Sequence, residues 1–475
     1  MLKKLLVSLL SALLCMSVVA ETESQLNENQ NETDVKIDEK GDVFVAPLKY
    51  HITSDSTVEV IKDGSYKKLE SVVIPSEIRV DGHVYSVTSI GMYAFLGCRG
   101  LTSIEIPSGV TSIGKGAFYD CSGLTRVKIP LGVTSIEKGA FSGCNGLTSI
   151  EIPSSVTIIG DEAFFGCWSV TNIKIPSSVT IIGDEAFYRC GDLTSIEIPS
   201  SVTSIGNLAF FCCYRLTSIK IPSSVTSIGD GAFAACSSLT SINVSMDNLY
   251  YSSEEGILYD KNKTTLIYAP RVMKGRVEIP KSVTNIGEDA FSGCRGLTNI
   301  DIPSSVTSIG NYAFSNCDGL TSIEIPSSVT RMGNGAFIDC SGLTNINVAT
   351  DNSVYTSENG VLYDKNKTKL ICVPSVKKGK FEIPSSVTSI DDYAFEKCIG
   401  LTSIEIPSSV TSIGAYAFDR CVGLTSIDIP SSVTSIGKKA FYGCENLEIV
   451  IDNSKENVIV EENTFEDCKS VKFLK

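Results

Sequence analysis

Cysteine is the residue type whose chemistry stands out in this chain. There are 17 cysteines among 475 residues, and most follow one another at a fixed step of 23 residues. In an exported protein such a number would ordinarily predict disulfides, and clustered thiolates could also hold a metal ion. One cysteine per repeat at constant phase instead favours parallel, inward-facing thiols in a core. We therefore expect buried free thiols, with Cys212 and Cys372, which lie off the series, as candidates for pairing.

Other residues that could do chemistry are few. The chain has only two histidines, His51 and His83, which argues against a multi-histidine metal site or a set of Ser-His-Asp units. Asp260-Lys261-Asn262 and Asp364-Lys365-Asn366 faintly resemble a calcium loop, but both lack the following glycine and the distal glutamate. We expect no enzyme activity, no catalytic residue, no cofactor and no metal site.

The charged residues exclude one class of partner. Forty Lys and Arg against 54 Asp and Glu give a formal net charge of −14, which excludes a nucleic-acid binder, since that class needs a basic face to neutralise phosphates. With 43% hydrophobic and 20% charged residues, the chain can bury a large core.

Acidic residues are concentrated at one recurring position, the middle of an Ile-x-Ile-Pro segment. In the first half this position alternates in sign, reading Glu105, Lys128, Glu151, Lys174, Glu197 and Lys220. Later it carries no base, and Arg276 and Lys380, two residues upstream, relieve only part of the repulsion between neighbouring acids. We call the later acidic residues the acidic strip and expect it to bind a basic partner surface or loosely held divalent cations, with neutral drift on a solvated face as the alternative: Glu278, Asp301, Glu324, Glu382, Glu405 and Asp428.

A repeat of 23 residues must position all of these side chains. In the unit from Leu147 to Cys167, Leu147, Ile150 and Ile152 alternate as in a short β-strand, which Pro153 ends. Phenylalanine keeps the same step three residues before each cysteine. The cysteine series is Cys98, Cys121, Cys144, Cys167, Cys190, Cys213, Cys236, Cys294, Cys317, Cys340, Cys398, Cys421 and Cys444, with Cys468 one residue late.

The second half of the unit returns the chain to the next strand. Val156 and Ile159 form a second apolar pair, and Gly160 allows a bend before Asp161-Glu162 begins a short helical turn. Phe164 then fills the centre of the coil. One coil has too little core to fold alone, so neighbouring coils must cover it. We predict a β-rich α/β solenoid with one continuous parallel sheet and short helical turns on the opposite side.

The period is broken twice, in the same way. Residues 245–280 and 349–384 span two long coils, in which the step between equivalent positions is 35 residues and the Ala-Phe-x-x-Cys turn is missing. They carry residues 256–264 and 360–368 instead, each with two short apolar runs around a polar turn, which predicts a β-hairpin on the rim. Three normal coils and one long coil give a longer period of 104 residues.

The repeat also resembles a known family. Its Leu-x-x-Ile-x-Ile signature is typical of leucine-rich repeats, and the form with Ile-Pro-Ser-Ser-Val-Thr-Ser-Ile-Gly and Ala-Phe-x-x-Cys resembles the BspA-like family of bacterial and protozoan surface proteins, from about Leu69 to Cys468. This resemblance implies a leucine-rich-repeat fold and adhesion to host matrix proteins, epithelium or other microbes.

The chain divides into five predicted segments. Residues 1–20 have the basic start, apolar run and small residues of a cleaved signal peptide, and 21–42 form a disordered acidic tether. Residues 43–68 form an N-terminal cap, 69–445 the solenoid, and 446–475 a degenerate C-terminal repeat or cap. Because no stretch reaches the ~20 apolar residues of a membrane-spanning helix, we expect no transmembrane segment and a secreted or cell-surface location.

These observations predict an extracellular protein that mediates adhesion or protein–protein recognition through its exposed sheet face. The expected partner is a host matrix or microbial surface protein. The alternative is a structural or self-associating component of a surface layer. The polar, degenerate last coil from Leu447 to Cys468 argues against end-to-end stacking.

Overall fold

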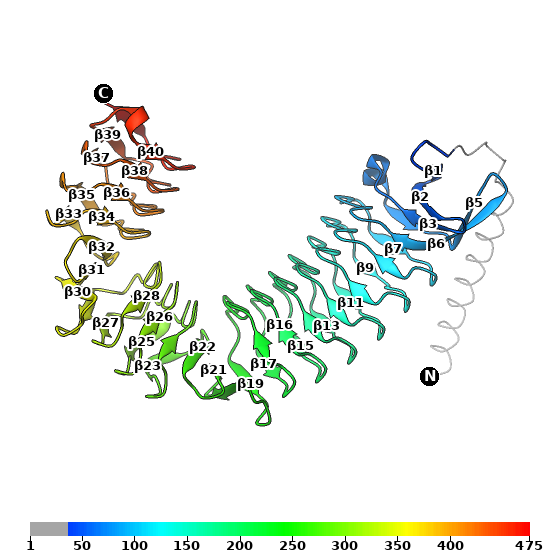
Figure 1. The fold of residues 1–475 in the computed structure, drawn as a ribbon, viewed down its shortest axis with the longest axis horizontal. Helices are drawn as coiled ribbons and strands as arrows, with labels where there is room; N and C mark the ends of the chain where they lie inside the picture. Colours follow the sequence, from blue (N-terminus) through cyan, green and yellow to red (C-terminus); the bar gives the residue numbers. More distant parts are fainter. Residues whose placement is uncertain (1–36) are drawn as a thin grey trace, which may run out of the picture.

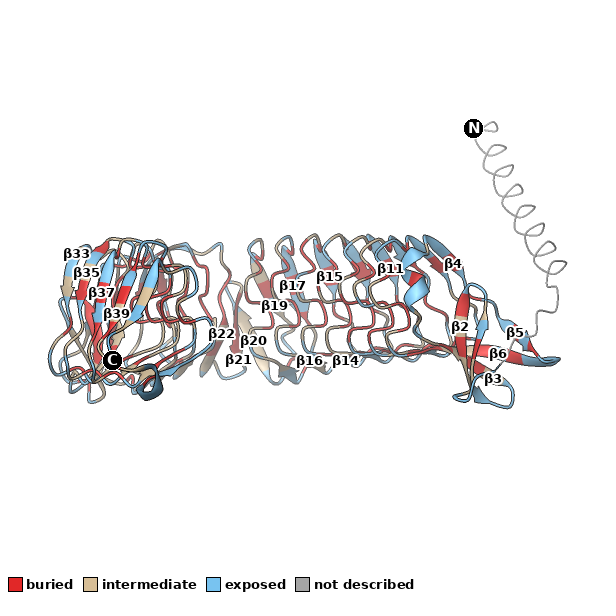
Figure 2. Cartoon of the chain, turned by 90° about the horizontal axis from the view of Figure 1, so that it is seen from above, coloured by how far each residue is buried: buried red, intermediate tan, exposed pale blue. Residues whose placement is uncertain are grey.

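Short coils stack side by side into an open arc in the computed structural model, which describes residues 37–475 (Figure 1). The predicted signal peptide and residues 21–36 of the predicted tether lie outside the described residues. Along most strands of the normal coils, buried and exposed residues alternate, so the apolar side chains face the inside of the stack (Figure 2). The predicted repeat solenoid is therefore confirmed.

The Ile-x-Ile segments form the first of two parallel ladders. The prediction of one continuous sheet is wrong, because this ladder is divided into seven short sheets. Each coil contributes only two to six residues to it, and at the long coils a hairpin tip intervenes: the Ile242 amide donates to the Gly256 carbonyl (3.1 Å). The strands of this ladder are β4 (Ser71–Val73), β7 (Ser103–Glu105), β9 (Arg126–Val127), β11 (Ser149–Glu151), β13 (Asn172–Lys174), β15 (Ser195–Glu197), β17 (Ser218–Ile221), β19 (Ser241–Val244), β23 (Lys274–Glu278), β25 (Gly296–Asp301), β27 (Ser322–Ile325), β29 (Asn345–Val348), β33 (Gly379–Glu382), β35 (Leu401–Glu405), β37 (Ser426–Ile429), β39 (Glu448–Ile451) and β41 (Ser470–Phe473).

A second parallel ladder, not predicted from the sequence, is built from the return segments. It runs on the opposite side of the coils from the first ladder (Figure 2). Ile159, expected only as part of an apolar pair, is buried in this ladder between Ile136 and Ile182. The strands are β6 (His83–Ile90), β8 (Ser112–Ile113), β10 (Ser135–Ile136), β12 (Ile158–Ile159), β14 (Ile181–Ile182), β16 (Ser204–Ile205), β18 (Ser227–Ile228), β22 (Thr265–Tyr268), β24 (Asn285–Ile286), β26 (Ser308–Ile309), β28 (Arg331–Met332), β32 (Lys369–Cys372), β34 (Ser389–Ile390), β36 (Ser412–Ile413), β38 (Ser435–Ile436) and β40 (Ile459–Val460).

The segment after Gly160 is a series of hydrogen-bonded turns, so the predicted short helical turn is wrong. Glu162 has a φ of 54°, a left-handed conformation that interrupts an α-helix. The N–H of Phe164 donates to the Ala186 carbonyl of the next coil (2.8 Å), whereas the N–H of Phe165 bonds back to the Glu162 carbonyl (3.0 Å). The helices of residues 37–475 are two 3-10 segments, η1 (Gly64–Lys68) and η2 (Lys455–Asn457).

Gly160 serves close packing rather than the expected bend. A Cβ atom at this position would lie 2.7 Å from the Ile136 carbonyl oxygen of the preceding coil. Any larger residue would therefore push the two coils apart. The amide of Gly160 donates to that same carbonyl at 2.8 Å, which fixes the spacing of neighbouring coils.

Each long coil contains a three-stranded antiparallel meander. Strand β20 (Tyr251–Glu254) pairs with β21 (Ile257–Asp260), and β21 pairs with β22. Because β22 also pairs in parallel with β24, the meander returns the chain to the second ladder. Strands β30 (Tyr355–Glu358), β31 (Val361–Asp364) and β32 repeat this arrangement.

A stack of phenylalanine rings runs through the core. Phe164 is fully buried, with ring centroids 5.7 Å from Phe141 and 5.5 Å from Phe187 and nearly parallel planes. The predicted role of phenylalanine at the centre of each coil is confirmed. The series of parallel phenylalanine rings is interrupted at each long coil. The buried residues form three hydrophobic clusters, which meet at the long coils.

The two ends of the stack are different. At the N-terminal end β1 (Asp42–Val45), β2 (Leu48–Ser54) and β3 (Thr57–Val60) form an antiparallel sheet that continues through β6 to β5 (Glu77–Val80). Tyr66 of η1 stacks on Phe95, with centroids 5.2 Å apart. At the C-terminal end β41 pairs with β39 and leaves its other edge open.

Replacing Phe164 with alanine should destabilise the middle of the stack by about 3–5 kcal/mol, because it removes a buried ring and leaves a cavity between two others. Denaturant unfolding of the variant measures this loss. The control is Phe465→Ala at the half-buried end of the stack, which should cost less. Equal losses at the two positions would show that the ring stack adds little to the core.

Candidate functional site

The acidic strip lies on the exposed face of the first ladder. Its members stand on β23, β25 and β27 and on β33, β35 and β37. Glu278 lies in register with Asp301, and Glu382 lies in register with Glu405, so neighbouring strands place like charges side by side. All six side chains are exposed except that of Asp301, which is half-buried.

Three groups within the described chain partly neutralise the strip. Arg276 contacts Asp301, with its Nε 2.6 Å from Oδ2. Lys380 lies between two strip residues, with its Nζ 2.7 Å from Glu405 and 3.1 Å from Glu382, and both hydrogen bonds raise the pKa of the lysine.

The third group is an amide. Asn347, the neutral residue at the recurring position, donates to Glu324 at 2.6 Å. Neither Glu278 nor Asp428 has an ion-pair partner among residues 37–475. The sequence therefore located the strip, while the structure shows that four of its six carboxylates share three donors.

The first half of the same ladder is balanced. Lys174 lies in register with Glu151 on one side and with Glu197 on the other. Opposite charges on adjacent strands favour stacking by a few tenths of a kcal/mol per pair. The ladder therefore has a charge-balanced half and an acidic half on one continuous row of coils.

The hairpin tip of the second long coil divides the acidic half into two groups of three, and the tip of the first long coil lies just before Glu278. Each tip carries a paired acid: Glu254 contacts Lys263 at 2.6 Å, and Glu358 contacts Lys367 at 2.7 Å. The tip also accepts a hydrogen bond from the adjacent ladder strand, since the Ile346 amide donates to the Gly360 carbonyl (3.1 Å). The second long coil thus interrupts the strip, and the first long coil marks where the strip begins.

The cysteine series forms a buried column, as predicted. Within each run of normal coils, the thiol donates to the carbonyl of the phenylalanine that precedes the equivalent cysteine of the previous coil, as in Cys121 to Phe95 (3.0 Å) and Cys144 to Phe118 (3.2 Å). After the long coils, Cys294 donates to the Pro270 carbonyl and Cys398 to the Val373 carbonyl instead. Burial raises the pKa of Cys167 to about 12. Of the described cysteines, Cys372 and Cys468 are half-buried and the others are buried.

The two histidines have local roles in the N-terminal sheet region. His51 Nδ1 lies 2.9 Å from the Asp42 carboxylate, which also contacts Lys49 at 2.9 Å. The hydrogen bond from Lys49 is the main reason that the pKa of Asp42 is lowered. His83 lies near the Asp81 carbonyl (3.3 Å).

Residues 37–475 contain neither a cluster of metal-ligating side chains nor a membrane-spanning helix. No group of three or more His, Cys, Asp or Glu side chains in this range is arranged to hold a metal ion. No helix in the same range is long and apolar enough to cross a membrane.

One cavity was missed by the sequence analysis. It lies at the second long coil and is lined by residues that include Phe337, Cys372 and Glu396. The available signal was Cys372 itself, an off-series cysteine that stands 104 residues after Tyr268. The walls of the cavity come from coils that are far apart in the sequence, which the position of Cys372 alone does not reveal.

The two parallel ladders with inward Leu, Ile and Phe positions define a leucine-rich-repeat solenoid. A family model described as BspA type leucine rich repeat region (6 copies) matches residues 65–190, 157–266, 274–378 and 372–475. These matches cover most of the chain, and the chain belongs to this family.

The chain is also similar to several solved structures. The chain is similar to a leucine rich cell surface protein from Faecalibacterium prausnitzii A2-165, with 30% identity over 88% of this chain and 97% of that chain and a TM-score of 0.56. It is also similar to a leucine-rich repeat protein from Bacteroides ovatus ATCC 8483, with 28% identity, 91% and 99% coverage and a TM-score of 0.46. The pneumococcal vaccine antigen PcpA matches at 18% identity, with 90% and 98% coverage and a TM-score of 0.46. No curated protein matches the chain.

The buried thiols should make stability fall at alkaline pH. Burial raises the pKa of Cys167, Cys294, Cys398 and Cys444 to about 12 in the folded chain, whereas an unfolded thiol ionises near its usual value of about 8.5. Stability from these groups is complete below about 8.5 and is lost as pH rises toward 12. Denaturant unfolding measured across this range should show the decline.

The control for this pH dependence is a chain with these four cysteines changed to alanine. That variant should be less stable at neutral pH but should lose stability less steeply as pH rises. A slope unchanged from that of the original chain would mean that the thiols ionise equally in the folded and unfolded states.

Proposed function

We propose that this protein is an extracellular recognition protein that binds a basic surface of a partner protein through its acidic strip. Membership of a family of bacterial leucine-rich-repeat cell-surface proteins supports the extracellular setting. A binding role in adhesion to a host matrix or microbial surface protein fits a long solenoid face that is open to solvent.

The observation that carries the proposal is the unbalanced charge of the strip. Its six carboxylates stand on the strands of one ladder, and the cations that contact them among residues 37–475 are Arg276 and Lys380. A net negative charge therefore remains, and like charges on neighbouring strands cost stability. A basic partner surface would relieve this repulsion and would be steered toward the strip by its field. The balanced first half offers no comparable field.

A structural or self-associating role is the second candidate. The last strand, β41, is an open edge to which another strand could pair. However, Lys469, Lys472 and Lys475 lie in or beside it, and charged lysines on an edge oppose strand addition. This observation favours recognition over end-to-end stacking.

Neutralising the strip should weaken partner capture. We expect a variant with Asp301→Asn, Glu324→Gln, Glu405→Gln and Asp428→Asn to lose binding to extracellular-matrix and microbial surface preparations in a pull-down. The loss should exceed tenfold, because each removed charge contributes to steering and to charge-assisted contacts. Repeating the assay with and without calcium separates a basic protein partner from a cation-dependent one.

The matched control changes Glu105, Glu151 and Glu197 to glutamine in the balanced half of the ladder. This control should retain partner capture. Unchanged capture by the strip variant, together with a higher melting temperature, would contradict the proposal and favour a solvated face without a ligand. Loss of self-association in sedimentation without any loss of partner capture would favour the second candidate.

A further inference from the structure

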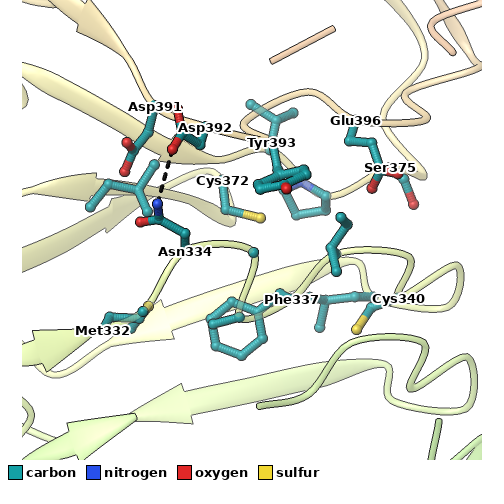
Figure 3. Close-up of a pocket in the computed structure, with 18 of the residues that line it drawn as sticks. Met332, Asn334, Phe337, Cys340, Cys372, Ser375, Asp391, Asp392, Tyr393 and Glu396 are labelled. Atoms are coloured by element: carbon teal, nitrogen blue, oxygen red, sulfur yellow. Dashed lines mark hydrogen bonds between the residues drawn. The ribbon is translucent and has the colours of Figure 1, made fainter. Parts of the chain in front are cut away.

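A cavity interrupts the stack of rings at the second long coil. Its volume is about 200 Å³, and it lies between the coil that carries Phe337 and Cys340 and the segment that carries Cys372 (Figure 3). The equivalent place at the first long coil, beside Phe233 and Tyr268, has a cavity of only about 10 Å³. Because both long coils have the same length and meander, side-chain identity sets the difference.

Two large side chains fill the first junction. The Tyr268 ring packs edge-on against Phe233, with centroids 6.3 Å apart, and Arg271 donates from Nε to a backbone carbonyl at 2.9 Å. The residues 104 positions later are Cys372 and Ser375. These smaller side chains leave the space open, and Phe337 stacks only on Phe314 among the described residues.

Glu396 places a carboxyl group at the second junction. Its counterpart 104 positions earlier is Ser292. The Glu396 side chain is 7% exposed, and its Oε2 has no hydrogen-bond partner among residues 37–475. Its Oε1 lies 3.7 Å from Lys397 Nζ, but that amine is already bonded to Asp339.

The environment of Glu396 disfavours its charge. Burial raises the pKa of Glu396 to about 8, and repulsion from Asp339 acts in the same direction, while Lys397 opposes both. A buried carboxyl without a partner costs free energy. A bound cation that paired with this carboxyl group would favour its charged form.

Each of the other carboxylates that line the cavity has a hydrogen-bond or ion-pair partner, which is Lys397 for Asp339 and Thr368 for Asp364. Lys369 Nζ lies 2.8 Å from Asp391, and Asn334 donates to Asp392 at 2.9 Å, shown as the dashed line in Figure 3. Glu396 is therefore the lining carboxylate left for a ligand. Apolar walls come from residues that include Phe337, Leu343 and Val373.

We propose that this cavity binds a small organic cation that has one primary ammonium group and a ring-sized apolar body. An apolar cavity of about 150 Å³ is enough to hold benzene, so the larger space accommodates a ring with an aminomethyl group. The ammonium group would pair with Glu396, and the apolar body would pack against the apolar lining, which includes Phe337. The site is separate from the acidic strip and does not depend on the proposed function.

Calorimetric titration of the full chain with benzylamine and with benzyl alcohol tests this proposal, since the two probes have nearly the same size and differ in charge. Benzylamine should bind at least about tenfold more tightly than benzyl alcohol, because a charge-assisted hydrogen bond forms only with the ammonium. Glu396→Gln should remove this preference while benzyl alcohol still binds. Glu405→Gln, which changes an exposed acid of the strip, should leave both affinities unchanged.

Filling the cavity gives an independent test. Cys372→Tyr introduces the residue of the first junction and should abolish binding of both probes, with circular dichroism showing that the solenoid remains folded. If this variant does not fold, the Glu396→Gln result decides alone. No detectable binding of benzylamine, equal binding of the two probes, or full binding by a folded Cys372→Tyr variant would overturn the proposal.

Discussion

The whole structure depends on hydrogen bonds that leave one coil and end on the next. The turn amides of each coil, such as that of Phe164, donate to carbonyls of the following coil, and the strands add two parallel ladders. These bonds hold neighbouring strands about 4.8 Å apart. Every side chain that recurs every 23 residues therefore becomes one member of a column. The columns of rings, thiols and charges are all consequences of this constraint.

The repeat made much of the fold predictable, because a fixed period in the sequence becomes a fixed position in space. Burial of Phe164 and Cys167 followed from their phase alone. The second ladder was not predictable because segments such as Ile158–Ile159 are too short to show alternation. The helical turn was predicted wrongly because the left-handed backbone of Glu162 has no local signature in a non-glycine residue.

The candidate sites differ in the same respect. The acidic strip could be predicted because it occupies one phase of the repeat, and Arg276 was recognised two residues upstream of it. The hydrogen bond from Asn347 to Glu324 required side-chain geometry. Predicting the cavity would have required comparing Cys372 with Tyr268, its equivalent in the first long coil. It would also have required knowing that Glu396, on the coil after Cys372, is buried. The volume of a cavity depends on the space that neighbouring side chains leave unfilled, and the repeat pattern of a sequence does not contain this information.

The interrupted ring stack also has a mechanical consequence. At the second junction no ring of the next coil stacks on Phe337 within the described chain, and the gap is spanned by Tyr312 and Tyr393, whose rings meet edge-on and whose hydroxyl oxygens lie 2.9 Å apart. At the first junction Tyr268 continues the apolar contact. A pulling force along an elongated protein stretches its most compliant plane first. Under tension between its ends, this arc would yield at the second junction and behave there as a built-in extensible link.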